Sequence, residues 1–202
     1  MPPAPSAPML AQLDRRLLRW MRTTGHSPQA ERAVKLLASA GEWGAVWTAG
    51  ALAAAAVDEP RRARWLRAAP VPIAAVGLNY VVKLAARRSR PKLRGLPPLA
   101  GAPSALSFPS AHATSSFAAA VAMGRVAPRA RPALLAGATA MALTRPYLGM
   151  HFPSDVLAGS ALGTAIGLAA PGLGGDRPAS VEQRMADIVA RHAENGQLTA
   201  VS

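Results

Sequence analysis

Three short segments of the chain combine histidines, fixed cations and a carboxylate in a pattern that suits phosphate chemistry. The segments are 83–91, 108–112 and 145–155, and each lies at the end of an apolar stretch. Cations can neutralise the oxygens of a phosphoester, while a histidine can attack the phosphorus or protonate the departing oxygen. The simplest interpretation is a phosphoester attacked by a histidine at a membrane surface. The residues concerned are Lys83, Arg90, His112, Arg145, His151 and Asp155.

The acid of the third segment, Asp155, follows His151 by four residues. If a helix begins near Pro153, the carboxylate lies close enough to orient the imidazole and to stabilise its cationic form. The other ring nitrogen is then the nucleophile, as in hydrolytic triads. Alternatively, Ser154 or Asp155 simply caps the last helix. Both can hold, but capping explains the acid and leaves the histidine unexplained.

The second histidine, His112, follows Pro-Ser-Ala at the expected start of a helix. A histidine at this place can donate a proton to a leaving alkoxide. The backbone N–H groups of residues 110–112 would also point at an anion. Taken alone, His112 is explained about equally well as an interfacial histidine hydrogen-bonded to a loop.

Three cations, Lys83, Arg90 and Arg145, would neutralise the non-bridging oxygens and the charge of the transition state. The alternative is that cations at a membrane edge snorkel toward water. Snorkelling explains Arg145 badly, because this residue interrupts an otherwise apolar helix. It is the better account of a second set of basic residues: Arg87, Arg88, Lys92 and Arg94.

Two histidines and an aspartate could instead hold a metal ion. Three clustered cations argue against this, since they would repel a divalent ion. We therefore expect no metal site and no other cofactor.

Composition places the chain among membrane proteins. Its 202 residues are half hydrophobic and only 4% aromatic, and the formal charge is +13. This combination favours a small membrane protein with basic edges. Nucleic-acid binding is disfavoured, because the cations alternate with long uncharged runs and do not line one continuous face. Cysteine is absent, which excludes a thiolate nucleophile and a disulfide framework.

The hydrophobic pattern predicts an all-α fold, a membrane helix bundle of about five spanning helices. Residues 1–35 would be a tail with an amphipathic interfacial helix over Met9–Arg22, followed by a second helical segment from Pro28. Residues 36–173 would be the membrane-embedded domain, and residues 174–202 a polar tail with a short helix near Val181–Arg191. The expected spans are Leu36–Val57, Leu66–Ala86, Ala111–Val126, Pro132–Leu143 and Ser154–Leu173.

Topology alone would gather the chemical residues on one side of the membrane. With five crossings, the loops 87–109 and 145–154 share one face. The segment Gly95–Pro109 is rich in proline and glycine, so we expect an ordered loop over a site. Gly159, Gly163 and Gly167 lie four residues apart and predict close helix packing.

The motifs Lys-x6-Arg-Pro, Pro-Ser-x-His and Arg-x5-His-x3-Asp, in this order, resemble the three signature segments of the type 2 phosphatidic acid phosphatase superfamily. That superfamily shares its helical fold with the vanadium-dependent haloperoxidases, so the resemblance implies a haloperoxidase-like core. The match covers about residues 80–160. Ala111 stands where glycine is usual, so a methyl group must be tolerated beside the phosphate. Thr144 stands where serine often precedes the arginine.

The resemblance implies a role for each matched residue. His151 becomes phosphorylated, Asp155 orients it, and His112 is the acid–base partner. Lys83, Arg90, Ser110 and Arg145 hold the phosphate beside Ala111, with no metal required.

The resemblance also narrows the substrate. Gly41-Glu-Trp and the segment 103–115 look similar to the actinobacterial branch that dephosphorylates decaprenylphosphoryl-5-phosphoribose. Undecaprenyl diphosphate, phosphatidic acid and phosphatidylglycerol phosphate remain alternative substrates, because the motifs recognise phosphate and not the group beyond it. The non-enzyme alternative is a membrane protein that only binds anionic lipids.

The expected location is the cell membrane. Basic residues flank both faces, among them Arg15 and Arg16 on one and Arg61 and Arg62 on the other. Some charge on the active-site face serves the phosphate and is discounted from the positive-inside count. The remaining basic residues then favour the opposite face as the cytoplasmic one, which predicts an external active site.

Overall fold

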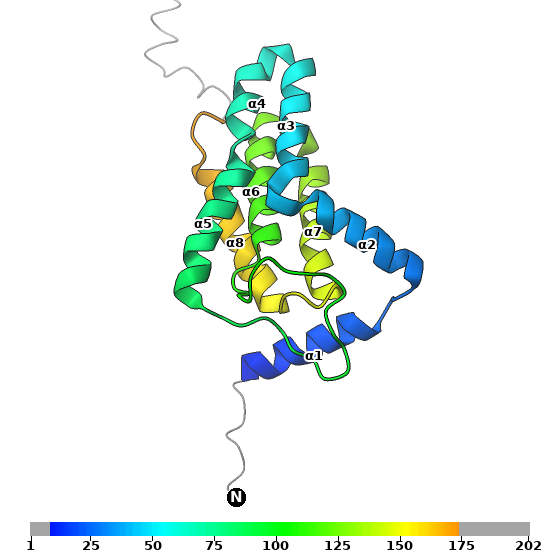
Figure 1. Cartoon of the computed structure of the whole chain (residues 1–202). Helices are drawn as coiled ribbons and strands as arrows, with labels where there is room; N and C mark the ends of the chain where they lie inside the picture. Colours follow the sequence, from blue (N-terminus) through cyan, green and yellow to red (C-terminus); the bar gives the residue numbers. More distant parts are fainter. Residues whose placement is uncertain (1–8, 174–202) are drawn as a thin grey trace, which may run out of the picture.

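The computed structural model describes residues 9–173, and helix α6 (Ala111–Val126) runs through the middle of their arrangement (Figure 1). Most of its side chains are buried, and most of these are alanine, serine or threonine. Helices α5 (Val71–Ala86), α7 (Arg131–Tyr147) and α8 (Pro153–Ala169) pack against it. Small side chains on the central helix let its neighbours approach closely, which explains how a bundle forms with so few aromatic residues.

The predicted glycine ridge forms the contact between α8 and α6. A Cβ atom at Gly159 would lie 2.6 Å from the carbonyl oxygen of Ser110, and one at Gly167 would lie 2.7 Å from that of Ala118. At Gly163 a Cβ atom would collide with the carbonyl oxygen of Thr114. Side chains larger than hydrogen therefore cannot fit between the two helices without moving them apart, and the prediction of close packing is confirmed.

The other end of the bundle holds helices α3 (Ala45–Val57) and α4 (Arg62–Ala68), joined by a 3-10 turn over Glu59–Arg61. Another such turn, Pro128–Ala130, joins α6 to α7 at the same end (Figure 1). Trp65 is buried here with small residues of α3 and α6. This end is remote from the three motif segments.

The N-terminal helices are α1 (Met9–Thr23) and α2 (Pro28–Ala40), within a residue of the predicted segments. Ser27 accepts a hydrogen bond from the N–H of Ala30 and so caps α2. Helix α1 lies across the end of the bundle opposite α3 and α4, and the loop 87–110 passes beside it (Figure 1). Its buried residues are Asp14, Leu18 and Arg22, whereas its apolar stripe points outward: Leu10, Leu13, Leu17 and Trp20 are exposed.

One predicted span is wrong. Leu36–Val57 is not a continuous helix, because α2 ends at Ala40 and a 3-10 turn over Glu42–Gly44 precedes α3. Trp43 and Gly44 both have positive φ angles, 56° and 75°, which break the helix. A Cβ atom at Gly44 would lie 2.8 Å from Cβ of Pro72, so only glycine fits this close approach.

The number of membrane crossings stays a prediction. Within residues 9–173, one helical stretch, Glu59–Ala86, is long and apolar enough to cross a membrane by length and composition. Helices α6, α7 and α8 have 16 or 17 residues, fewer than the roughly 20 that a span usually needs. Large apolar side chains nevertheless face outward along several helices, among them Leu52, Ile73, Val81, Leu84, Leu157 and Leu168. The predicted helix near Val181–Arg191 lies outside the described residues.

Candidate active site

A cavity of about 880 Å³ lies where the three motif segments meet. Its walls come from the middle and end of α5, the start of α6, the last turn of α7 and the loops around residues 90, 101–104 and 151. Six of the predicted site residues line it: Lys83, Arg90, Ala111, His112, Arg145 and His151. The expectation that loops far apart in sequence share one face is met, and the N–H of Leu99 donates directly to the carbonyl of Leu148.

The imidazole of His151 is 2% exposed and lies between two charged groups. Its Nε2 atom is 3.1 Å from Nη1 of Arg90. A guanidinium has only N–H donors, so Nε2 must accept and the ring proton belongs on Nδ1. Burial lowers the pKa of His151 to about 4, and Arg90 and Arg145 add to this, while Asp155 opposes it. The ring is therefore neutral at neutral pH, with the lone pair of Nε2 on the side of Arg90.

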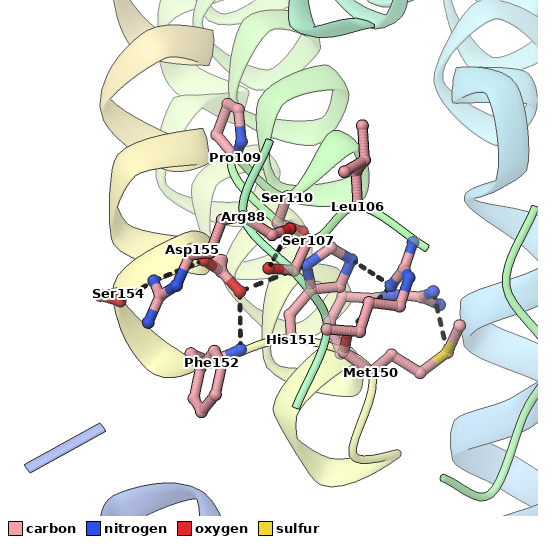
Figure 2. A network of polar contacts seen from close by, with 12 residues as sticks. Arg88, Leu106, Ser107, Pro109, Ser110, Met150, His151, Phe152, Ser154 and Asp155 are labelled. Carbon is pink, nitrogen blue, oxygen red and sulfur yellow. Dashed lines mark hydrogen bonds and ion pairs between the residues drawn. The ribbon is translucent and has the colours of Figure 1, made fainter. Parts of the chain in front are cut away.

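The carboxylate of Asp155 is fully buried behind this ring (Figure 2). Its Oδ2 atom accepts a hydrogen bond of 2.8 Å from the N–H of Phe152, which caps the first turn of α8. The same oxygen is 3.7 Å from Nδ1 of His151, closer than any other carboxylate of residues 9–173 but too far for a hydrogen bond. Nδ1 itself has no partner among the described residues. Asp155 thus caps the helix and also faces the histidine.

Two of the three predicted cations hold the loop 104–109. Lys83 donates from Nζ to the carbonyls of Leu106 and Pro109, at 3.2 and 3.1 Å. Arg90 donates from Nε to the carbonyl of Ser104 at 2.7 Å and from Nη1 to that of Met150 at 2.9 Å. Burial lowers the pKa of Arg90, although Asp155 opposes this effect. These cations reach the cavity with their charge uncompensated by any ion pair in residues 9–173.

The third cation, Arg145, has the fewest side-chain hydrogen bonds of the three. It is buried, its Nη2 atom donates only to the thioether sulfur of Met150 at 3.0 Å, and its Nε atom has no partner in the described chain. Sulfur is a weak acceptor. A buried guanidinium in this condition is unfavourable unless an anion enters the cavity.

The histidine of the second segment is placed by the end of α2. His112 donates from Nε2 to the carbonyl of Ala38 at 2.9 Å, which leaves Nδ1 for another partner. This contact brings an N-terminal helix to the site, although the sequence motif contains no part of it.

Ser110 is not among the residues that line the cavity. It is fully buried, and its Oγ accepts from the N–H of Ala113 at 3.5 Å at the start of α6. Its own N–H donates to the carbonyl of Asp155 at 2.9 Å. Ser110 is absent from the cavity wall and instead caps α6 and ties it to α8.

Two residues of the site were missed from sequence. Arg88, which we assigned to membrane-edge snorkelling, donates to Asp155 Oδ1 at 2.7 Å and to Asp14 Oδ2 at 2.8 Å. Asp14 was not considered at all. The available signal was that it is the lone acid of a strongly basic helix, which is unusual unless a buried partner needs it.

One wall of the cavity is built by the turn that breaks the predicted span. Gly41, Glu42 and Trp43 line the cavity there, and Tyr80 of α5 also lines it. A Cβ atom at Gly41 would collide with the side chain of Met141, so this turn lies directly on α7. Glu42 is the one carboxylate among the lining residues, all of which belong to the described part of the chain.

The donor set does not suit a metal ion. Between residues 9 and 173, no three histidine, cysteine or acidic side chains lie close enough together to hold one. The cavity presents cations and two imidazoles, which is the donor set for an anion.

Comparisons with known proteins agree with this geometry. Residues 64–178 match the PAP2 superfamily. The chain is 40% identical over 131 residues to the decaprenylphosphoryl-5-phosphoribose phosphatase of Mycobacterium tuberculosis, covering 65% of this chain and 73% of that protein. It is 38% identical over 125 residues to the protein of the same name from Mycolicibacterium smegmatis, covering 62% and 68%.

Solved structures show the same fold. The transmembrane PAP2-type phosphatidylglycerolphosphate phosphatase of Bacillus subtilis has a TM-score of 0.66 at 22% identity, covering 82% of this chain and 86% of its own. LpxE of Aquifex aeolicus has a TM-score of 0.61 at 21% identity, covering 84% and 98%. Together with the family match and the 40% identical relatives, these neighbours confirm the resemblance noted in the sequence. The chain belongs to the PAP2 superfamily and is a membrane lipid phosphate phosphatase, a phosphoric monoester hydrolase.

Proposed function

We propose that the chain hydrolyses the phosphate monoester of decaprenylphosphoryl-5-phosphoribose, or of a closely similar polyprenyl-linked sugar phosphate. The names of its relatives at 38–40% identity support this substrate. The observation that carries the proposal is the neutral imidazole of His151, whose Nε2 lone pair lies 3.1 Å from Arg90 in a cavity that contains three buried or half-buried cations. Such a site has a nucleophile and the charges to bind a phosphate beside it.

The reaction proceeds in two steps. Nε2 of His151 forms a bond to phosphorus as the ester P–O bond breaks. The imidazolium form of His112 gives its Nδ1 proton to the leaving alkoxide, while its Nε2–H stays on the carbonyl of Ala38. Asp155 stabilises the cationic ring of the phosphohistidine. His112 then removes a proton from a water molecule, which attacks phosphorus, releases phosphate and restores His151. Lys83, Arg90 and Arg145 hold the phosphate oxygens throughout, so no metal ion is required.

The wall formed by Glu42 and Trp43 suits the part of the substrate beyond the phosphate. Glu42 lines the cavity and its charge acts on Arg145. A carboxylate repels a phosphate but accepts hydrogen bonds from hydroxyl groups, which a pentose offers. Trp43 is largely exposed on this wall, where an aromatic ring can pack against a sugar face or a lipid chain.

The membrane arrangement is part of the proposal. We infer about five crossings in the cell membrane and an active site on the external face. The motif loops at one end of the bundle and the α4 region at the other support opposite faces for the two (Figure 1). Single cysteines at Ala102, in the cavity loop, and at Ala63, in α4, can be probed with an impermeant thiol reagent in intact cells. Labelling at position 63 without labelling at 102 would reverse the assignment.

The substrate and the nucleophile can be tested together. Purified protein is offered decaprenylphosphoryl-5-phosphoribose, undecaprenyl diphosphate, phosphatidic acid and phosphatidylglycerol phosphate, and phosphate release is measured. We expect the ribose compound to give the highest kcat/KM. Rapid quench should trap an acid-labile, base-stable phosphoprotein in the wild type and none in His151→Ala.

Two outcomes would contradict the proposal. An equal or higher kcat/KM for another lipid on this panel would contradict the proposed substrate. Wild-type activity in His151→Ala would contradict the role of His151 as the nucleophile. Activity should also survive a chelator and be inhibited by vanadate, which mimics the transition state. Loss of activity with chelator that one divalent ion restores would contradict the metal-free mechanism.

A further inference from the structure

Helix α1 presents a carboxylate to the body of the protein. Asp14 is 3% exposed and accepts three hydrogen bonds from outside its own helix. They come from Nη2 of Arg88 at 2.8 Å, from the N–H of Ser154 at 2.9 Å and from the hydroxyl of Ser154. Burial raises the pKa of Asp14, but the hydrogen bonds from Ser154 and Arg88 outweigh this effect and the pKa is lowered. Asp14 is therefore ionised inside the protein.

Arg88 connects this carboxylate to the one beside the histidine, and Figure 2 shows its contact with the latter, Asp155. One end of its guanidinium pairs with Asp14, and the other pairs with Asp155 at 2.7 Å. The guanidinium also lies 4.4 Å from the centre of the Phe152 ring, which holds it from one side. We call Asp14, Arg88, Ser154 and Asp155 the rear network, since Asp155 faces His151 from behind.

The charge balance of the rear network depends on Asp14. With two carboxylates on one guanidinium, the network keeps a net negative charge beside His151. Without the charge of Asp14, Arg88 would neutralise Asp155 fully. The phosphohistidine ring is cationic, so it is stabilised by a net negative neighbour more than by a neutral one.

Asp14 also fixes the start of α8. Phe152 occupies the N-cap position and has no side-chain oxygen to accept a hydrogen bond from the first turn. Asp14 supplies an acceptor for the N–H of Ser154 from another helix, one residue before Asp155. It therefore holds the backbone from which the orienting carboxylate projects.

We propose that Asp14, which lies outside the segment matched by the family, is a positioning residue for His151 and acts through Arg88 and Asp155. The proposal rests on the proposed role of His151 as nucleophile. It predicts that the N-terminal interfacial helix is part of the catalytic apparatus and not only an anchor. The rival explanation is that Asp14 merely docks α1 on the bundle.

The test uses the full chain in detergent micelles with decaprenylphosphoryl-5-phosphoribose. For each variant, kcat is divided by the amplitude of the phosphoenzyme burst, which counts competent sites. Asp14→Asn should lower kcat per site about 10-fold to 100-fold with KM within about 2-fold, as for other indirect orienting contacts. Asp14→Glu, which keeps the charge, should recover most of this loss.

The control is Arg22→Gln. Arg22 is another buried residue of α1, two helical turns after Asp14. It anchors the helix by donating to the carbonyls of Pro97 and Tyr147, and it does not touch the rear network. It should lower thermal stability and leave kcat per site unchanged. Arg88→Gln interrupts the same connection between Asp14 and Asp155. The fold loss of kcat per site in the double variant should therefore be smaller than the product of the losses in Asp14→Asn and Arg88→Gln.

Three results would overturn the proposal. They are wild-type kcat per site in Asp14→Asn, an equal loss in Arg22→Gln, or fully multiplicative effects of Asp14→Asn and Arg88→Gln. If Asp14→Asn does not fold, Arg88→Gln alone decides, with wild-type kcat per site as the contradicting result. Absence of a phosphoenzyme burst in the wild type would instead count against the proposed nucleophile.

Discussion

Two charged clusters meet at His151, and they differ in how their charges are balanced. The phosphate-side cluster consists of Lys83, Arg90 and Arg145, three cations whose hydrogen bonds go to backbone carbonyls, a histidine nitrogen and a thioether. Within residues 9–173 none of them has an ion pair. The rear network, in contrast, pairs each of its charges at 2.7–2.8 Å.

The difference shows which cluster needs a ligand. Every charged group of the rear network has an oppositely charged partner within the protein, so the network stabilises the fold. The cations of the phosphate-side cluster gain such a partner only when an anion occupies the cavity, so the cluster reduces stability until substrate binds. Substitutions in the two clusters should therefore separate activity from stability.

The largest effect is expected at Arg145. Arg145→Met should lower kcat/KM about 10³-fold, as when one preorganised donor to a transition state is lost. Thermal stability should stay the same or rise, because the change removes a buried cation without an anionic partner. Activity assays and melting curves of the same preparation measure both. A drop in melting temperature of several degrees would show that Arg145 supports the fold.

In the rear network, Asp155→Asn should impair both properties. We expect kcat to fall about 10²-fold and the free energy of unfolding to fall by about 3 kcal/mol, because Arg88 loses one partner of a buried ion pair. Asp58→Asn is the matched control, since its pair with the half-exposed Arg61 lies at the far end of the bundle. It should change neither property appreciably. Unchanged stability in Asp155→Asn would remove the distinction between the clusters.

Acidification probes the histidine between the clusters. The pKa of His151 is lowered to about 4 from 6.5, so the unfolded chain binds this proton first as the pH falls. The neutral ring contributes its full share to the free energy of unfolding above about pH 6.5. This contribution is lost as the pH falls from about 6.5 to about 4. From pH 7 to pH 5 the wild type should lose about 2 kcal/mol more than His151→Gln. Parallel losses in the two proteins would contradict the depressed pKa.

The smallest effect is expected at the wall formed by Glu42 and Trp43. Glu42→Gln should lower kcat/KM for decaprenylphosphoryl-5-phosphoribose about 10-fold, by loss of hydrogen bonds to the pentose. Turnover of phosphatidic acid, which has no sugar, should be unchanged or slightly faster. Gln keeps the size of the side chain, so a change in folding is not expected. Equal effects on both lipids would place Glu42 outside sugar recognition.

The sequence was sufficient for the phosphate-side cluster because its residues lie in motifs with fixed spacing at helix ends. The regular helices followed from hydrophobic pattern and capping, as for Pro28–Ala40 behind Ser27. The break at Trp43 and Gly44 was missed because apolar residues flank the turn on both sides, and the positive φ angles of these two residues leave no mark in the hydrophobic pattern. Asp14 and Arg88 were missed because their contact joins positions 74 residues apart, and charge alone did not distinguish a paired arginine from a snorkelling one.

The glycine ridge of α8 has an evolutionary consequence. Because Gly159 and Gly163 lie against the backbone oxygens of Ser110 and Thr114, the separation of α8 and α6 does not depend on the exposed side chains of α8. The exposed residues of α8, such as Leu157 and Leu168, are free to change without altering that separation. Selection on the ridge would keep the start of α6, which carries His112, beside the start of α8, which follows His151, while exposed positions of the helix turn over.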